Sequence, residues 1–393
     1  MAIHNVRDYG ALGDGQVNDA PAIQKALDEG GCIYIPAGNY RIGNTLKMHS
    51  HTRIQADGGA RLFLCERQPK KRGDFLLSNA DPDAGNEDIT ISGGIWDGNF
   101  DGKNITKDPD LFNPDAWSGA VLNFVNVKRL TLTGMHVCNS TTFYVRMARL
   151  EDFVIRDIHF SSVRPAFNQD GLHFGGHCYR GCIENITAAP GQTNDDMIAL
   201  NADDSIVRLE NLDLCRGPIE DVTIRGIWAE NCYTAFRLLS VTSPIRRIRI
   251  ENIYTGCRHF LFNLDGARYC RTPLLQEEQY PKGAGLAEDI TVDNVCCWNT
   301  DPNCAEKALI VCESVPKRFV VRSLTRDMTR DQKPELPTLH VGKVTVTAVY
   351  AAAGENHSQA MLHTKDDVFR LSGDLDMLTM HSHAEGTTVP VEA

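Results

Sequence analysis

The 393-residue sequence contains no apolar run of the ~18 residues that a membrane-spanning helix requires. It also has little concentrated positive charge, because 40 Lys and Arg stand against 51 Asp and Glu and the basic run Lys70-Lys71-Arg72 is short. An acidic balance without a basic face disfavours nucleic acid as a partner. We therefore expect neither a membrane nor a nucleic acid to be the partner of this chain.

The N-terminal residues Met1–Asn5 lack the charged and apolar regions of a secretory signal. The 13 cysteines are odd in number and scattered, and Cys296 and Cys297 are adjacent, which does not suit a disulfide framework. We expect reduced cysteines in a cytoplasmic protein, with secretion as the alternative if a leader has been removed.

An alternating apolar phrase recurs along the chain, anchored on residues 91, 132, 155, 183, 224, 250 and 292. The successive intervals are 41, 23, 28, 41, 26 and 42 residues. The short intervals match one coil of a β-solenoid, and the long ones match a coil that carries a loop. Asn-Gly pairs, which are typical of β-hairpins, are absent. We predict an all-β fold, a single-stranded right-handed parallel β-helix.

Residue types that tolerate a left-handed turn stand two residues after five of the anchors. They are Asp157, Asn185, Gly226, Asn252 and Asn294. An asparagine in such a turn can bond its counterpart in the next coil. A second strand precedes most anchors, and its alternation directs Val145 and Met147, and the equivalent residues of later coils, into the core. The opposite parity predicts an external stripe of Arg146, His173, Ala199, Arg237 and Asn263.

The first residues differ from the repeat. Residues 21–27 predict a short helix, with Asn18 or Asp19 near its cap and Gly30-Gly31 at its end, which would cover the first coil. We expect residues 1–45 to form the N-terminal cap and first coil, residues 46–345 the β-helix catalytic domain, and residues 346–393 a C-terminal cap or tail.

Aspartates gather in two consecutive coils, in Asn168-Gln169-Asp170-Gly171 and Asn194-Asp195-Asp196-Met197. Clustered acids repel one another, which raises the pKa of at least one, so a catalytic use or a structural cation is expected. Strict alternation would point Asp170 and Asp196 inward, so a functional use requires a backbone turn there. The stripe residues Arg146, His173 and Arg237 would then contact the hydroxyls or a carboxylate of a substrate.

Other polar motifs favour structural roles. His177, Cys178 and Cys182 lack a fourth zinc ligand at comparable spacing, and Asn201–Asp204 more simply solvates a loop or binds a cation. The glycines between Gly10 and Gly15 lack the spacing of a nucleotide-binding loop. We expect no cofactor and no catalytic metal.

At the aspartate motifs the sequence resembles the polygalacturonase-like glycosidases, glycoside hydrolase family 28, within the pectate-lyase-like β-helix superfamily. The opening segment 5–15 and the segment 35–40 are similar to the start of that superfamily, and the resemblance spans roughly residues 5–300. Asn168-Gln169-Asp170 is similar to the family's Asn-Thr-Asp element, Asp195-Asp196 to its Asp-Asp-Cys element, and Arg237-Leu238-Leu239 to its Arg-Ile-Lys.

The resemblance implies an inverting glycoside hydrolase with Asp170, Asp195 and Asp196 as catalytic residues. Asp195 or Asp196 would be the general acid, and Asp170 and the remaining aspartate would activate water. Arg237, Arg146, His173, His177 and Asn168 would bind substrate, and Trp117 and Tyr144 are candidates for stacking on a sugar.

The sequence departs from the family in two places. The family's Gly-His-Gly histidine is missing, a role that His173 or His177 could take, and Leu239 replaces the lysine that holds a uronate carboxylate. These departures count against galacturonan as the substrate. A lyase or uronate epimerase, or a glycan-binding β-helix without turnover, remains the alternative. The expected partner is a carbohydrate, and a homo-oligomer is left open.

Overall fold

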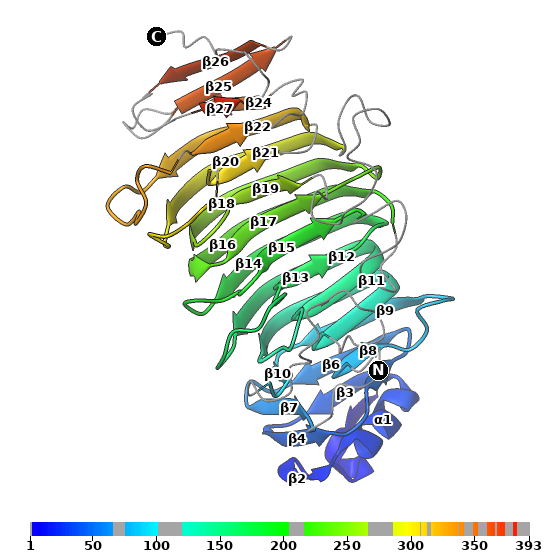
Figure 1. The fold of residues 1–393 in the computed structure, drawn as a ribbon. Coiled ribbons are helices and arrows are strands. Elements are labelled where there is room, and N and C mark those ends of the chain that lie inside the picture. The colour runs from blue at the N-terminus through cyan, green and yellow to red at the C-terminus, as the bar shows by residue number, and fades with distance from the viewer. Residues whose placement is uncertain are drawn as a thin grey trace. The chain divides into compact units, whose positions relative to one another are not determined.

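The computed structural model describes residues 2–65, 75–100, 120–203, 216–265, 286–306, 308–312, 316–336, 338–341, 349–352, 360–365, 368–373 and 380–382. The chain divides into two compact units. Unit 1 comprises residues 1–173 and 178–195, and unit 2 comprises residues 174–177 and 196–393. Nearly all the elements are β-strands paired in parallel (Figure 1). The all-β right-handed parallel β-helix predicted from the sequence is confirmed.

Unit 1 begins with β1 (Ile3–Asn5), a 3-10 turn (Val6–Tyr9), β2 (Asp14–Asn18) and helix α1 (Ala20–Glu29). Its further strands are β3 (Gly31–Ile35), β4 (Gly38–Ile42), β5 (Leu46–Met48), β6 (Thr52–Ala56), β7 (Ala60–Leu64), β8 (Leu77–Asn79), β9 (Asn86–Ser92), β10 (Ile95–Asp97), β11 (Leu122–Cys138), β12 (Val145–Ser161) and β14 (Cys178–Ala188). Strand β13 (Leu172–Phe174) crosses the boundary between the units.

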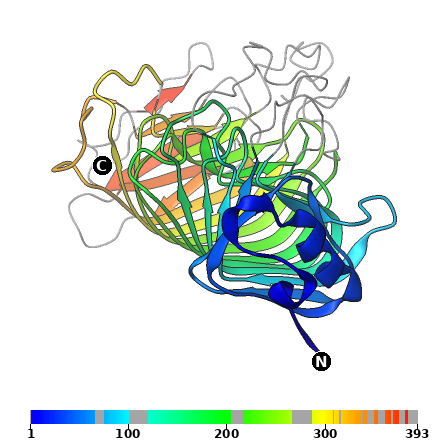
Figure 2. The same ribbon diagram turned by 90° about the horizontal axis from the view of Figure 1, so that it is seen from below.

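Helix α1 confirms the helix predicted at residues 21–27 and extends it at both ends. Asn18 accepts a hydrogen bond from the Ala20 N–H, so it serves as the capping side chain, and Gly30 ends the helix at a φ of 69°. Asp19 makes no capping bond. Figure 2 shows α1 across the end of the first coils of unit 1.

The strands of unit 1 form three parallel rows. One row runs through β5, β8, β11 and β12, the second through β3, β6, β9, β11, β12 and β14, and the third through β4, β7, β10, β11 and β12. The long strands β11 and β12 belong to all three rows, because each bends at left-handed residues, β11 at Arg129 and Gly134 and β12 at Asp152 and Asp157.

Unit 2 contains two long parallel rows. The first joins β15 (Asp196–Asn201), β17 (Thr234–Leu239), β19 (Phe262–Asp265), β21 (Ile310–Cys312), β23 (Leu339–Val341) and β27 (Met380–Ser382). The second joins β16 (Ile219–Cys232), β18 (Ile245–Cys257), β20 (Ala287–Asn299), β22 (Pro316–Arg326) and β24 (Val349–Ala352). Strands β25 (Ala360–Lys365) and β26 (Val368–Gly373) follow as an antiparallel pair.

The sequence anchors stand opposite one another in these rows. In unit 1 the aligned residues are Ile91, Leu132, Ile155 and Ile183, and in unit 2 they are Ile224, Ile250 and Val292. All of these anchors are buried. Burial of each such side chain contributes about 1.5–3 kcal/mol, which explains why the repeat persists in the sequence.

The turn after each anchor is also as predicted. All five residues, Asp157, Asn185, Gly226, Asn252 and Asn294, have φ between 54° and 69°. The Asn185 amide donates to Asp157 at 3.0 Å, and the Asn294 amide donates to Asn252 at 2.8 Å. These side-chain bonds stack one coil on the next.

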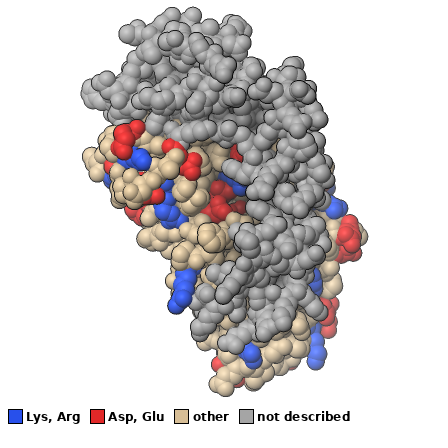
Figure 3. Space-filling view, viewed as in Figure 1, with Lys and Arg blue, Asp and Glu red and all other residues tan. Residues whose placement is uncertain are grey.

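Charged side chains of both signs lie beside one another on the face shown in Figure 3. Among the described residues, no helix has the length and apolar character needed to cross a membrane. Residues 101–119, 204–215 and 266–285, which make up much of the predicted loop insertions, lie outside the described residues, as does Trp117.

Candidate active site

The outward side of the first row in unit 1 carries a line of polar side chains. Lys47, Ser78, Asn123 and Arg146 occupy aligned positions on β5, β8, β11 and β12. The Lys47 ammonium donates to the Ser78 hydroxyl at 2.8 Å, and Arg146 Nε donates to Asn123 Oδ1 at 2.8 Å. The predicted stripe residue Arg146 is therefore held in place by the coil before it.

The stripe is not external, which corrects the sequence prediction. Arg146 and His173 are each only 2% exposed. The Arg146 guanidinium lies 5.3 Å from the centre of the Phe75 ring, and the His173 ring stacks on Phe143 at 3.9 Å. Apolar residues in the segments that precede the strands cover this row, and the alternation within the strands gave no sign of them.

Asp170 lies two residues before the start of β13 and is buried. Its Oδ2 is 2.5 Å from Nδ1 of His173, whose side chain has the outward parity. The Asp170 carboxylate is therefore on the outward side, so the backbone turn that a functional role required is present. The inward direction given by strict alternation is wrong for Asp170.

The loop before Asp170 is pinned by hydrogen bonds. Gln169 accepts from the Ala166 N–H at 2.8 Å and donates to the Ser140 carbonyl at 2.6 Å, and the Asn194 amide donates to the Ala166 carbonyl at 2.9 Å. The candidate Asn168 adopts a left-handed conformation with a φ of 55°.

This fixed loop presents Phe167 with 71% of its surface exposed. Phe167 was not among the residues predicted from sequence, although its position directly before the Asn-Gln-Asp element and its aromatic character were visible signals. Tyr144, which was proposed to stack on a sugar, is fully buried and donates to the Ser161 carbonyl, so that proposal is wrong. Tyr144 was misassigned because it precedes the inward-facing Val145 by one residue, so strict alternation pointed its ring outward.

Asp195 is partly exposed. It follows β14 and is the last residue of unit 1. Carboxylate oxygens of Asp170 and Asp195 lie within 4.8 Å of each other. The structure therefore brings two of the three predicted acids together within unit 1. Asp196 is the next residue in the chain and the first residue of unit 2.

In unit 2, Asp196 begins β15 and is 3% exposed. Its Oδ2 lies 3.8 Å from Nη1 of Arg237, which stands on β17. Arg237 also donates to Oδ2 of Asp265 on β19, at 2.9 Å from Nη2 and 3.2 Å from Nε. Asp265 is fully buried, and the sequence analysis missed it because it has no place in the repeated phrase.

Leu239, which stands where the resemblance expects a lysine, is buried and aligned with Asn201 and Asp265 in the adjacent coils. The nearby Asp203 accepts bonds from the N–H groups of Thr242 and Ser243 at 3.0 and 2.8 Å, and from the N–H of Val241. Asp203 is therefore a structural carboxylate that fixes a loop, and Asp204 lies outside the described residues.

His177 is exposed and left-handed, and it belongs to unit 2. A Cβ atom on Gly217 would come within 2.4 Å of the His177 ring, so the ring packs directly against this glycine. His177 therefore lies on the surface of unit 2, and its described contacts assign it no role in the reaction.

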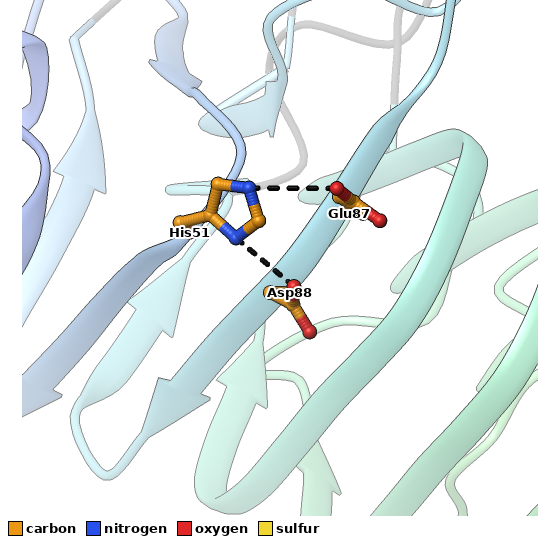
Figure 4. A group of neighbouring side chains, drawn as sticks. All are labelled: His51, Glu87 and Asp88. Atoms are coloured by element: carbon orange, nitrogen blue, oxygen red, sulfur yellow. Dashed lines mark ion pairs between the residues drawn. The ribbon is translucent and has the colours of Figure 1, made fainter.

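His51, Glu87 and Asp88 form a cluster with ligand-type side chains in unit 1 (Figure 4). His51 Nδ1 lies 2.9 Å from Asp88, and Nε2 lies 3.4 Å from Glu87. Arg129 donates to both acids, at 2.6 Å to Asp88 and 2.6 Å to Glu87. A guanidinium already satisfies these carboxylates, so the cluster is an ion-pair network and not a metal site.

The chain matches curated relatives over a small part of their length. The pre-neck appendage protein of Bacillus phage B103 is 28% identical over 178 residues, which cover 43% of this chain and 21% of that protein. The match thus spans about a fifth of that relative.

Two solved structures share the fold. The Streptococcus pneumoniae surface protein and adhesin PfbA superposes with a TM-score of 0.56 at 16% identity, covering 90% of this chain and 92% of that one. The Yersinia enterocolitica family 28 exopolygalacturonase superposes with a TM-score of 0.55 at 16% identity, covering 90% and 76%.

One protein family matches residues 3–258, which include the whole predicted set of site residues. That family is described as rhamnogalacturonase A/epimerase, pectate lyase-like. The chain belongs to this family.

Proposed function

We propose that the protein is a glycoside hydrolase that cleaves O-glycosidic bonds of an oligo- or polysaccharide. The observation that carries the proposal is the pair Asp170 and Asp195, whose carboxylate oxygens lie within 4.8 Å of each other beside His173. Two acids held this close favour unequal protonation, because the second charge is costly beside the first. One protonated acid and one carboxylate are what glycoside hydrolysis requires.

In the proposed reaction the protonated acid gives its proton to the glycosidic oxygen as the bond from that oxygen to the anomeric carbon breaks. A carboxylate takes a proton from the water that attacks the anomeric carbon. Asp195 or Asp196 is the general acid, and Asp170 and the remaining aspartate hold the water. His173 orients the Asp170 carboxylate and Asn168 contacts the sugar, while the buried Arg146, which the sequence predicted to bind substrate, fixes the polar row beside them.

The distance between the two carboxyl groups bears on whether the reaction inverts or retains the anomeric configuration. Inverting enzymes hold their acid and base ~6.5–9.5 Å apart, and retaining enzymes hold the two carboxyl groups ~5–5.5 Å apart. Asp170 and Asp195 are closer than the inverting range, so an inverting reaction requires their side chains to separate when substrate binds. Detection of the first-formed anomer by NMR decides between the two outcomes, and a retained anomer contradicts the inverting mechanism.

Substitution of the aspartates tests the proposal directly. Asp170→Asn, Asp195→Asn and Asp196→Asn should each lower kcat about 10²–10⁴-fold without lowering the melting temperature by more than a few degrees. The general-acid variant should recover activity on aryl glycosides with acidic leaving groups, because those need no proton. Asp157→Asn is the matched control, since asparagine already occupies the equivalent turn in the next coil. Full activity in all three variants would exclude the proposal.

A lyase or epimerase is the second candidate, and the contact between His173 and Asp170 is the observation that favours it. A histidine paired with a carboxylate is a suitable base for removing a proton next to a uronate carboxylate. Tyr144 does not fit this role, because burial raises its pKa above the ordinary value. Ultraviolet-absorbing products or inverted C5 centres would establish this alternative, and binding without any product would establish a glycan-binding protein.

A further inference from the structure

We propose that the subsite around Arg237 accepts a neutral sugar and rejects a uronate, with Asp265 as the specificity-determining residue. This inference rests on the proposed carbohydrate function and names its substrate class. It concerns unit 2, where Arg237 stands on the outward side of β17 between Ala199 and Asn263 of the adjacent coils.

The charge of Arg237 is already neutralised within the protein. Its Nη2 and Nε atoms donate to the same oxygen of Asp265 at 2.9 and 3.2 Å. A second carboxylate, that of Asp196, lies 3.8 Å from Nη1. Asp265 is fully buried and Asp196 nearly so, so water screens neither charge effectively.

A uronate bound at Arg237 would be a third carboxylate around one guanidinium. The attraction of Arg237 for this anion would be opposed by repulsion from Asp265, and from Asp196 when it is ionised, because both acids already lie against the same guanidinium. A neutral sugar pays no such cost, because its hydroxyls can accept from Arg237 and donate to carboxylates.

The neighbouring positions add no positive charge. Arg237 is flanked by Ala199 and Asn263 along its row, and two residues further along the strands Leu239 is aligned with Asn201 and Asp265. Among these described positions Arg237 is the sole basic residue, and Asp265 is an acidic side chain where an anion-binding site would need a lysine or arginine.

The test compares matched glycans that differ only in charge. Polygalacturonate, rhamnogalacturonan and alginate are each paired with the carboxyl-reduced polymer of the same linkage. Affinity electrophoresis measures binding to every pair, and a reducing-sugar assay measures turnover. We expect retardation by at least one reduced polymer at least about tenfold stronger than by its uronate form. Stronger retardation by the uronate forms, or by none of the reduced polymers, overturns the inference.

Asp265→Asn removes the charge and keeps the shape. This variant should raise uronate binding relative to neutral binding by about tenfold or more, because it removes a buried acidic group that lies against Arg237. Asp203→Asn is the matched control, a buried aspartate of the same unit that bonds only a loop in the contacts described above. An unchanged ratio in a folded Asp265→Asn variant overturns the inference.

The two proposals fail in different ways. Binding to a neutral polymer without turnover leaves this inference intact and removes the hydrolase function. Turnover of a uronate polymer in preference to its reduced form does the reverse.

Discussion

The pair formed by Arg237 and Asp265 is a residue-level contact with a direct consequence for stability. Asp265 is fully buried, whereas the Arg237 side chain keeps 18% of its surface exposed. A buried ion pair contributes little net stability, but breaking it leaves an uncompensated charge in the interior.

We therefore predict that Arg237→Ala lowers the free energy of unfolding by about 3–5 kcal/mol. The double variant Arg237→Ala/Asp265→Asn should recover a large part of this loss, because it removes the stranded charge. Urea unfolding followed by circular dichroism measures both. Equal destabilisation in the single and double variants would show that the loss comes from packing and not from charge.

Phe167 is the second residue for which the proposed site predicts a measurable role. Its loop is fixed by Gln169 and Asn194, so its ring is exposed without being mobile in the backbone. Stacking on the apolar face of a sugar would use such a ring with little loss of entropy.

Phe167→Ala should raise KM about tenfold and leave kcat nearly unchanged, which corresponds to about 1.4 kcal/mol of uniform binding. Val163→Ala is the control, because Val163 is 74% exposed in the same loop and lacks an aromatic face. Steady-state kinetics on the best glycan substrate give the answer, and an equal effect of the two substitutions would argue against stacking.

At the scale of the strands, successive coils carry alternating charge at one corner. Each pair occupies the positions four and three residues before an anchor, and acidic and basic pairs alternate from coil to coil. The second residue of each pair has a left-handed backbone conformation. In unit 1 the pairs are Glu87-Asp88, Lys128-Arg129 and Glu151-Asp152, followed by Tyr179-Arg180, and in unit 2 they are Glu220-Asp221, Arg246-Arg247 and Glu288-Asp289.

This alternation specifies the register of the coils, because a shift by one coil would place like charges opposite each other. Arg129 bonds Asp88 and Glu87, Arg180 bonds Asp152 at 2.6 Å, and Arg247 bonds Asp221 at 2.6 Å. The His51 cluster of Figure 4 is the first rung of this ladder.

The ladder predicts a pH-dependent stability. Hydrogen bonds from Arg129 and Arg180 lower the pKa of Asp88 and Asp152 below the ordinary 3.8. A carboxyl whose pKa is lowered by folding stabilises the fold above its unfolded pKa, and this stabilisation is lost as the pH falls through the folded value. Arg129→Gln should therefore lower the melting temperature slightly at pH 7 and much less below pH 3. A constant difference across this range, measured by scanning calorimetry, would contradict the electrostatic account.

The repeat explains which parts of the structure were predictable from sequence. The anchors such as Ile155 and Ile224, and the turn residues such as Asn185, follow local rules of burial and left-handed conformation that recur in every coil, so the sequence contains them many times. The charge ladder obeys the same spacing and was equally readable. Asp170 and His173 were selected, but their burial was not foreseen.

Unrepeated features could not be read in the same way. Phe75 and Phe143, which cover the polar row, lie in segments that differ from coil to coil, and Asp265 appears once. Their contacts depend on which strands are adjacent, which only the fold supplies. Alternation also failed at Asp170, because the strand begins after this residue and the period of two does not extend beyond the strand.

At the scale of the whole molecule, most of the described cysteines lie in the core. The ten cysteines for which the structure describes the state are all free, and Cys138, Cys178, Cys232, Cys257, Cys297 and Cys304 are buried. Cys232 and Cys257 stand opposite each other in adjacent coils of unit 2, so they stack as small apolar residues without a bond between them. Six of the ten described cysteines therefore lie in the core, and Cys32, Cys65, Cys182 and Cys296 are partly exposed.

Burial also decides how these thiols react. It raises the pKa of Cys297 and Cys138 to about 12, and that of Cys232 to about 11, from an ordinary value of 9.0. At pH 8 an ordinary thiol is about one-tenth ionised, whereas one with a pKa of about 12 is ionised about once in 10⁴ molecules, so ionisation alone slows alkylation about 10³-fold.

Among the described cysteines, we predict that iodoacetamide modifies the partly exposed Cys32 and Cys65 before the buried ones, as read by mass spectrometry of the native protein at pH 8. Cys297, Cys138 and Cys232 should remain unmodified until the pH approaches 11 or the chain unfolds, after which all thirteen cysteines should be labelled. A reducing agent should leave the melting temperature unchanged, because no bond among the described cysteines exists for it to break. Rapid labelling of Cys297 in the folded protein would show that the core of unit 2 opens to solvent, and would remove the structural reason for its altered pKa.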